Sequence, residues 1–435
     1  MKTKKLILCL IIGLLLNIVW NSESYAAIKN VVNSSGQPSC EAADVQTAIN
    51  IASDGDTVFI PAGSCTWDTQ VTVPNTKGII LMGAGVSKTT IIHGTGSTAS
   101  LKITGAEGKP FVVTGFTYDA NYTAPSTGIF NVVGDCKNFR IHHMTMKNNT
   151  GGGRFLHISG YTYGVIDHVT FDNDYMGIGV YSGDATGADA AWERPLTLGT
   201  ANAVYIEDCT FTQTGATGYF SNDGYHGARV VFRYNTVINE GLSFHGYDTG
   251  ARSIHSWEIY NNTFTVTSGL SRGRAINIRG GTGVIFNNTI TGNYTNAIIF
   301  DYYRSCTNPD HVDCGGSTTW GQCQTLGKGR CDGTNPADGN QDSTGYPCKD
   351  QHGRTTDADL NGIQDSSPVY EWNNTINGAD ADISINTWNG CANPAASDHL
   401  QSGRDYNNDT EHPTYTSYTY PHPLTKTPSK PESPR

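Results

Sequence analysis

A repeat with a period close to 26 residues runs through this chain and restricts its fold more than any other feature. Short runs rich in apolar residues end in Asn/Asp-x-Thr or a close variant, with the threonine at positions 117, 145, 170, 210, 236, 263, 289 and 375. Five of the seven spacings lie between 25 and 28 residues, and the spacings of 40 and 86 residues indicate insertions within single turns. A turn of this length holds about three short strands that pair in parallel with the next turn. The predicted fold is all-β: a single-stranded, right-handed parallel β-helix.

The asparagine beside the repeated threonine has a physical role in such a coil. Asn235, Asn262, Asn288 and Asn374 fall at corresponding positions of successive repeats. When turns stack, each buried amide can hydrogen-bond to the asparagine one turn away. We therefore predict an asparagine ladder. The 50 glycines supply the positive-φ corners that the turns require.

The segment before the repeats predicts a capped end. Residues 41–53 have apolar side chains at helical spacing, and 57–60 read as the first strand after an Asp-Gly-Asp turn. A helix placed there covers the open end of the coil and its strand edges. Cys40 and Cys65 flank this helix and strand, and we expect them to form a disulfide.

The string VQTAINIASDGDTVFIPAG, followed by IILMGAG and the Asn-Asn-Thr repeats, resembles the pectin-lyase-like right-handed β-helix superfamily over roughly residues 38–400. The resemblance is specific for the fold. It implies a protein that binds or acts on polysaccharides. That superfamily includes lyases, glycoside hydrolases, esterases, epimerases and non-catalytic adhesins. The polygalacturonase acidic pair and the pectate lyase R-x-P-R-x-R string are absent, so no catalytic residue is carried over.

The N-terminus is typical of an exported protein. Residues 1–26 combine a lysine-rich start, an apolar run and a Ser-x-Ala site, which predicts a signal peptide and a secreted protein, extracellular or on the cell surface. No membrane span is expected after its removal. Removal takes away three lysines and one glutamate, so the formal charge changes from −11 to −13. An acidic body argues against nucleic acid as a partner. Ten cysteines remain, and those between 306 and 391 have no predictable connectivity.

The predicted domain covers 27–405, and a Pro/Thr/Ser-rich tail covers 406–435. Insertions at about 183–200 and 305–367 are expected to form one wall of a cleft over the turns from Phe155 to Asp301. Within the second insertion, acidic and amide side chains alternate around a glycine, which resembles a calcium loop. The candidate calcium ligands are Asp357, Asp359, Asn361 and Asp365.

Aligning the turns on their threonines brings polar side chains from several turns onto one outward strip. The candidate catalytic residues there are His245, Arg252, Asp223, His226 and Asp301. The candidate substrate-binding residues are Arg274, Arg279, Tyr302, Tyr303, Arg304 and Trp192. Arginine binds carboxylates with two parallel hydrogen bonds, and tyrosine rings stack on sugars. His142, His143 and His168 are interpreted as surface or ladder residues.

An arginine- and histidine-rich strip on an exported coil favours a polysaccharide lyase acting on an anionic, uronide-containing polymer. Such an enzyme must neutralise the sugar carboxylate, remove the adjacent proton and protonate the leaving oxygen. A glycoside hydrolase instead needs two placed carboxylates, for which Asp223, Asp248 and Asp301 are the supply. A non-catalytic glycan-binding or adhesion module and a structural solenoid stay open as alternatives.

Overall fold

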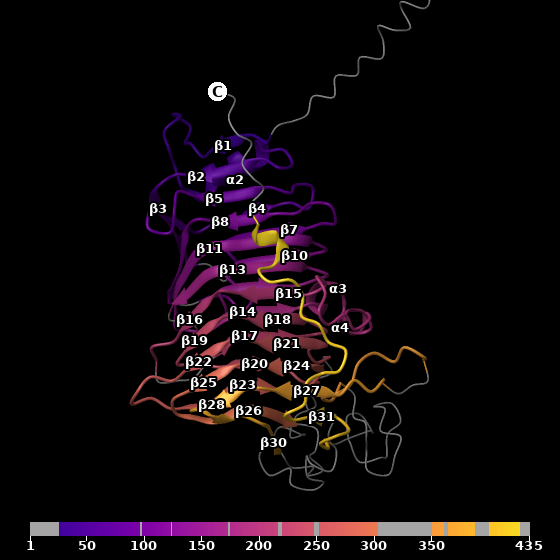
Figure 1. The fold of residues 1–435 in the computed structure, drawn as a ribbon. Helices are drawn as coiled ribbons and strands as arrows, with labels where there is room; N and C mark the ends of the chain where they lie inside the picture. The colour runs from indigo at the N-terminus through magenta and orange to yellow at the C-terminus, as the bar shows by residue number, and fades with distance from the viewer. Residues whose placement is uncertain are drawn as a thin grey trace, which may run out of the picture.

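The structure is a computed structural model, and it describes residues 26–95, 98–122, 124–172, 175–215, 220–247, 252–302, 350–360, 364–387 and 400–426. Its strands stack in parallel turns into an elongated coil (Figure 1). Three columns of strands, named here the first, second and third faces, follow one another in each turn. The predicted parallel β-helix is therefore confirmed.

The first face begins where β1 (Ile28–Asn30) pairs with β2. Its other strands are β2 (Thr57–Ile60), β5 (Ile80–Gly83), β8 (Val112–Thr114), the start of β11 (Lys137–Asn149) and of β13 (Tyr163–Asp172), β15 (Val204–Glu207), β18 (Arg229–Arg233), β21 (Ser256–Tyr260), β24 (Thr282–Phe286), β27 (Val369–Trp372) and β31 (Tyr406–Asn407).

The second face consists of β3 (Gly63–Trp67), β6 (Thr89–His93), β9 (Thr117–Tyr122), the ends of β11 and β13, β16 (Thr210–Thr212), β19 (Thr236–Ile238), β22 (Thr263–Thr265), β25 (Thr289–Thr291) and β28 (Thr375–Ile376). The antiparallel strand β29 (Ala379–Asp380) pairs with β28. The threonines at 210, 236, 263, 289 and 375 lie in register, as the repeat predicts.

The third face consists of two sheets joined by a bridge between Phe220 and Gly241. One sheet contains β4 (Val71–Val73), β7 (Leu101–Gly105), β10 (Phe130–Gly134), β12 (Leu156–Ile158), β14 (Met176–Tyr181) and β17 (Phe220–Tyr225). The other contains β20 (Leu242–Phe244), β23 (Arg272–Ile278), β26 (Tyr294–Tyr302) and β30 (Ile383–Thr387).

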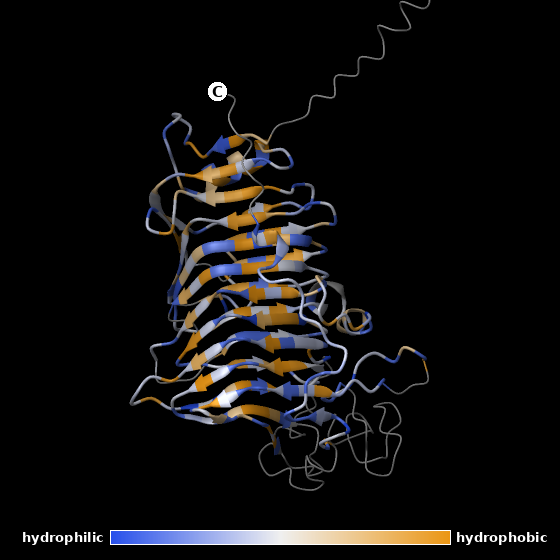
Figure 2. Ribbon diagram, in the orientation of Figure 1, coloured by the Kyte–Doolittle hydropathy of each residue, from blue (hydrophilic) through white to orange (hydrophobic). Residues whose placement is uncertain are grey.

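Inward side chains of the three faces form one continuous apolar core, because alternate residues of every strand point to the coil axis. Figure 2 shows this alternation as hydrophobic and hydrophilic segments along successive strands. The predicted asparagine ladder is confirmed. Nδ2 of Asn235 donates to Oδ1 of Asn262 at 3.1 Å, Asn262 to Asn288 at 2.9 Å and Asn288 to Asn374 at 2.8 Å.

The residue before each ladder position bends the chain from the first face to the second. Its φ is positive in seven successive turns, between 50° and 56°. The residues are His143, His168, Asp208, Tyr234, Asn261, Asn287 and Asn373. Asparagine tolerates this left-handed conformation better than most residues do. The bend breaks the alternation of the strand, so neighbouring side chains emerge on the same side.

Helix α2 (Ala42–Ile51) packs against β2 and β4 at the N-terminal end of the stack and buries Val45 and Ile49. The expected Cys40–Cys65 disulfide is present, with Cα atoms 5.8 Å apart. Helices α3 (Gly183–Thr186) and α4 (Ala188–Trp192) lie between β14 and β15, in the stretch where the first insertion is predicted. No helix among the described residues is long and apolar enough to cross a membrane.

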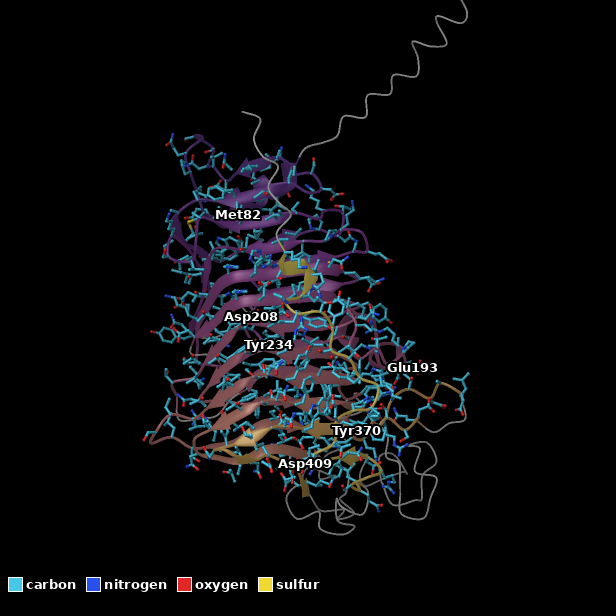
Figure 3. All side chains as sticks on the ribbon, viewed as in Figure 1. Met82, Glu193, Asp208, Tyr234, Tyr370 and Asp409 are labelled. Atoms are coloured by element: carbon cyan, nitrogen blue, oxygen red, sulfur yellow. A yellow bond between two sulfur atoms is a disulfide. The ribbon has the colours of Figure 1, made fainter. Side chains whose placement is uncertain are left out.

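The C-terminal segment runs back along the first face of the coil. After β31 the chain crosses the strands that precede it and ends in the short helix η4 (Pro423–Thr425) beside β11 and β13 (Figure 1). Tyr415, Tyr418 and Leu424 pack on an apolar cluster outside the core, and the ring of Tyr420 stacks on that of Tyr234 at 3.6 Å. Figure 3 labels Tyr234 and Tyr370 on this face.

Candidate active site

One outward column of the third face holds polar residues from adjacent turns. Asn131, His157, Gly179 and Asp223 are register partners on β10, β12, β14 and β17. Leu156 and Ile158 flank His157 and belong to the core, so alternation directs His157 outward. The same register makes Asn222 the partner of Ile178, a core residue, and leaves Asp223 outside.

Asp223 links a tyrosine to a histidine. The Tyr181 hydroxyl donates a hydrogen bond to Oδ2 of Asp223, and Nδ1 of His245 lies 2.7 Å from Oδ1. Burial alone would raise the pKa of Asp223. The contacts with His245, the Tyr181 hydroxyl and Arg279 have the larger and opposite effect, so the pKa of Asp223 lies below its usual value. Asp223 is therefore an ionised carboxylate at neutral pH.

His245 is placed to exchange protons with a ligand. It follows β20, and its backbone N–H donates to the carbonyl of Gly224 at 2.9 Å. Its side chain is 29% exposed, whereas that of Asp223 is 2% exposed. With Nδ1 held by the carboxylate, Nε2 is the nitrogen that a ligand can reach. None of the described residues hydrogen-bonds to it. A buried carboxylate behind a partly exposed imidazole is an arrangement that supports general base catalysis.

A second carboxylate lies close to two more histidines. Oδ1 of Asp184, in α3, lies 2.5 Å from Nδ1 of His226, and Oδ2 lies 3.2 Å from Nε2 of His157. Burial raises the pKa of Asp184, but the contacts with His157 and His226 lower it well below its usual range. Burial lowers the pKa of His157, although Asp184 opposes this effect.

Aromatic contacts connect these two groups. The Tyr181 ring lies 5.3 Å from the His157 ring and 5.5 Å from the Tyr225 ring, measured between centroids. Tyr225 in turn lies 3.9 Å from His226 and 4.5 Å from His245. Two Asp–His groups thus share one aromatic cluster, which limits the rotamers open to each imidazole.

Arg154 occupies a notch beside Tyr181. Its guanidinium carbon lies 4.3 Å from the centroid of the Tyr181 ring. A Cβ at position 179 would lie 2.5 Å from Nη1 of Arg154, so Gly179 leaves the space that the guanidinium fills. Nε and Nη1 of Arg154 are buried and have no hydrogen-bond partner among the described residues. An unpaired buried donor needs an explanation, of which a bound water or anion is one.

The structure brings together only part of the predicted strip. Asp223, His226 and His245 lie in the site, and Arg279 is close enough to lower the pKa of Asp223. Arg279 itself donates through Nε to the carbonyl of Phe244 at 3.3 Å. These are the predicted residues that line the cluster.

Arg252 and Trp192 form a neighbouring buried group. Arg252 makes two hydrogen bonds of 2.8 Å to Asp350 and one of 2.7 Å to Asp189. Trp192 is 1% exposed and lies under the guanidinium of Arg252, at 4.8 Å, and beside the His255 ring. Both side chains therefore anchor the first insertion to the coil instead of facing solvent.

Asp301 and Arg274 pair with each other on β26 and β23 of the third face. Nη1 of Arg274 lies 2.5 Å from Oδ2 of Asp301, and Asn386 donates to Oδ1 at 2.7 Å. Asp301 is fully buried, so its carboxylate is satisfied inside the structure. The side chain of Tyr302 and the residues Tyr303 and Arg304 lie outside the described part of the chain.

The predicted calcium loop is described in part. Oδ2 of Asp365 accepts a hydrogen bond from the N–H of Ala358 at 3.0 Å, and residues 354 and 366 form an antiparallel bridge. Asp357, Asp359 and Asp365 are not among the described groups whose acidic or imidazole ligand atoms converge. Asn361 lies outside the described residues, as does most of the second insertion.

Tyr181 and Asp184 are site residues that the sequence alignment missed. Tyr181 ends Met-Gly-Ile-Gly-Val-Tyr, an alternating strand that begins six residues after Thr170. The strand that begins at Leu242 follows Thr236 by the same six residues, so an alignment on the threonines could have found Tyr181. The insertion that follows hid it, because it lengthens the spacing to the next threonine to 40 residues.

Comparisons with known proteins give distant likenesses only. No protein-family model matches the chain, and no curated protein matches its sequence. ORF18 of Geobacillus virus E2 is 14% identical, with a TM-score of 0.40, covering 87% of this chain, which spans 62% of the viral chain. An alginate lyase from Paenibacillus sp. str. FPU-7 is 12% identical, with a TM-score of 0.44, covering 83% of this chain and 99% of its own. The A-module of a mannuronan C-5 epimerase from Azotobacter vinelandii is 13% identical, with a TM-score of 0.33, covering 83% and 98%.

Proposed function

We propose that this chain is a polysaccharide lyase that cleaves an anionic, uronide-containing polysaccharide by β-elimination. The observation that carries the proposal is the buried Asp223 carboxylate, which holds Nδ1 of a partly exposed His245 and leaves Nε2 toward the ligand. In this reaction a base removes the proton beside the sugar carboxylate, a double bond forms, and the glycosidic oxygen leaves with a proton.

Each requirement of the reaction has a candidate group. His245 accepts the proton through Nε2, and Asp223 positions it and stabilises the imidazolium. Arg154, with its buried unsatisfied donors, and Arg279 neutralise the carboxylate of the sugar, which lowers the cost of forming the carbanion. His226, held by Asp184, donates the proton to the leaving oxygen.

The glycoside hydrolase alternative fits the site less well. A hydrolase of the common type needs one carboxylic acid that stays protonated near neutral pH. The two carboxylates of this site, Asp184 and Asp223, both have lowered pKa values because histidines contact them. Neither group therefore stays protonated as a hydrolase acid must, whereas the proposed lyase uses both as ionised carboxylates.

The same proposal includes the setting of the protein. We infer that 1–26 is a signal peptide of an extracellular or cell-surface protein of the pectin-lyase-like type with a right-handed coil. Helix α2 then serves as a cap, the two insertions form a wall beside the site, and an extracellular polysaccharide is the partner.

Incubating the mature protein with a panel of polyuronides tests the proposed function. Ultraviolet absorbance and reducing ends should rise together, because β-elimination leaves an unsaturated sugar at each new end. Reducing ends without absorbance indicate a hydrolase. Retention on a polyuronide without turnover indicates a binding module. Either of the last two results contradicts the proposal.

We also propose that calcium orders the second insertion through Asp357, Asp359, Asn361 and Asp365. Oxygen ligands of this kind suit a hard divalent cation. Titration calorimetry should show calcium binding that disappears in Asp359→Ala, while the surface variant Asp68→Ala keeps it. Absence of binding at about millimolar calcium, the weak end of extracellular sites, contradicts this assignment.

A further inference from the structure

Three histidines and an aspartate meet on the outer side of the bend between the first and second faces, on the adjacent strands β11 and β13. His142 and Asp167 are register partners there. His143 and His168, the next residue of each strand, both have the positive φ of the bend. Because the bend interrupts alternation, the side chains of His142 and His143 emerge on the same side.

The potential ligand atoms of three of these residues converge. Nδ1 of His142 lies 2.7 Å from Nδ1 of His143. An imidazole nitrogen of His142, one of His143 and a carboxylate oxygen of Asp167 all lie within 4.8 Å of one another. Four ligands at about 2.1 Å from a tetrahedral ion lie about 3.4 Å apart, so a small outward rotation of one imidazole makes room for the ion.

We propose that His142, His143 and Asp167 form a binding site for a first-row divalent transition metal, for which Zn²⁺ is the probe. Two imidazole nitrogens and one carboxylate oxygen suit such ions, and water completes the coordination. Calcium and magnesium prefer an all-oxygen environment and are expected to bind poorly here. The site lies on a different face from the Asp223–His245 group, and it does not depend on the proposed lyase activity.

The surrounding residues orient these ligands. Arg140 donates to both oxygens of Asp167, at 2.8 Å and 2.7 Å. Nδ1 of His168 lies 2.9 Å from Oδ2 of Asp167, and its ring stacks on that of His143 with centroids 4.9 Å apart. Such contacts fix the orientation of a ligand and typically change metal affinity by about 10- to 100-fold.

The bend offers a variant that removes a ligand with little risk to the fold. The position of His143 is occupied by Asn261, Asn287 and Asn373 in later turns, with the same positive φ. Asparagine is one of the few residues besides glycine that accept this left-handed conformation. His143→Asn should therefore fold normally, and His168→Asn is a matched control at the same position of the next turn.

Zinc binding to the full-length, chelator-treated protein tests the site by titration calorimetry. We expect one site in the wild type, a loss of more than about 100-fold in affinity in His143→Asn, and a loss of no more than about 100-fold in His168→Asn, in line with its supporting role. Thermal melts check that both variants are folded. Equal affinity in wild type and His143→Asn, equal losses in the two variants, or no zinc binding by the wild type overturns the proposal.

Discussion

Replacing His245 by alanine is expected to lower kcat on the polyuronide that the panel identifies by about 10²- to 10⁴-fold, the usual contribution of a general base. The fold should survive because His245 lies outside the core and its side chain is 29% exposed. Initial rates measured by ultraviolet absorbance, together with a thermal melt of each variant, check both expectations.

Two further variants separate proton transfer from a loss of structure. Tyr181→Phe removes the hydroxyl that donates to Asp223 and keeps the ring contacts, so kcat should fall by less than in His245→Ala. His412→Ala removes a histidine of the C-terminal segment and should leave kcat unchanged. If His245→Ala keeps the wild-type kcat, another residue is the base. That result contradicts the role of His245, even if the protein cleaves the polymer.

Arg279→Ala distinguishes binding from chemistry in the same assay. Its guanidinium is expected to meet the sugar carboxylate, so KM for the polyuronide should rise more than the dissociation constant for a neutral polysaccharide. A binding module without catalysis would instead lose affinity in both the His245 and the Arg279 variants, with no turnover to lose.

The fold was predictable because the same short sequence pattern recurs many times along the chain. An asparagine and a threonine that follow each bend, repeated with a period of 25 to 28 residues, leave little choice but a parallel coil. The site was only partly predictable. Whether Asp223 or its neighbour Asn222 faces outward depends on the exact register, because a shift of one residue exchanges inward and outward side chains.

Other differences between the predicted strip and the structure arise from partners that are distant in the sequence. From the sequence alone, Arg252 is a reasonable candidate for binding an anion. In the structure its Nε and Nη2 both donate to Asp350, which lies 98 residues further along the chain. Asp301 is similarly satisfied by Asn386, 85 residues away. A repeat predicts which residues neighbour each other in adjacent turns. It says nothing about residues that an insertion or a terminal segment returns to the coil.

Replacing Arg233 by methionine is expected to destabilise the protein by about 3–5 kcal/mol, the usual cost of removing one partner of a buried ion pair. Arg233 is fully buried, its Nε donates to Glu207 at 2.7 Å, and its remaining nitrogens donate to the Tyr260 hydroxyl and to the carbonyls of Tyr418 and Thr419. The change thus leaves Glu207 without its cationic partner and removes the hydrogen bonds of Arg233 to the C-terminal segment. Urea unfolding followed by circular dichroism measures the loss.

Two controls identify the buried pair as the cause. Lys137→Met breaks an ion pair with Glu107 in which the two side chains are 49% and 76% exposed, so it should destabilise the protein far less than Arg233→Met does. Arg233→Met combined with Glu207→Leu removes both charges, so the double variant should regain much of the stability that the single variant loses. If Arg233→Met destabilises the protein no more than Lys137→Met does, the result contradicts a stabilising role for the docked C-terminal segment.

The pH dependence of the same variant follows from Glu207. Burial raises the pKa of Glu207 above its usual value even though Arg233 lowers it, so without Arg233 the pKa must rise further. A carboxyl group whose pKa is higher in the folded than in the unfolded state adds stability at low pH, and this is lost as the pH rises through the folded value. Arg233→Met should therefore be closest to wild-type stability near pH 4 and furthest from it above neutrality. Arg233→Met/Glu207→Leu should not show this trend, because no carboxyl group is left at position 207 to take up the proton.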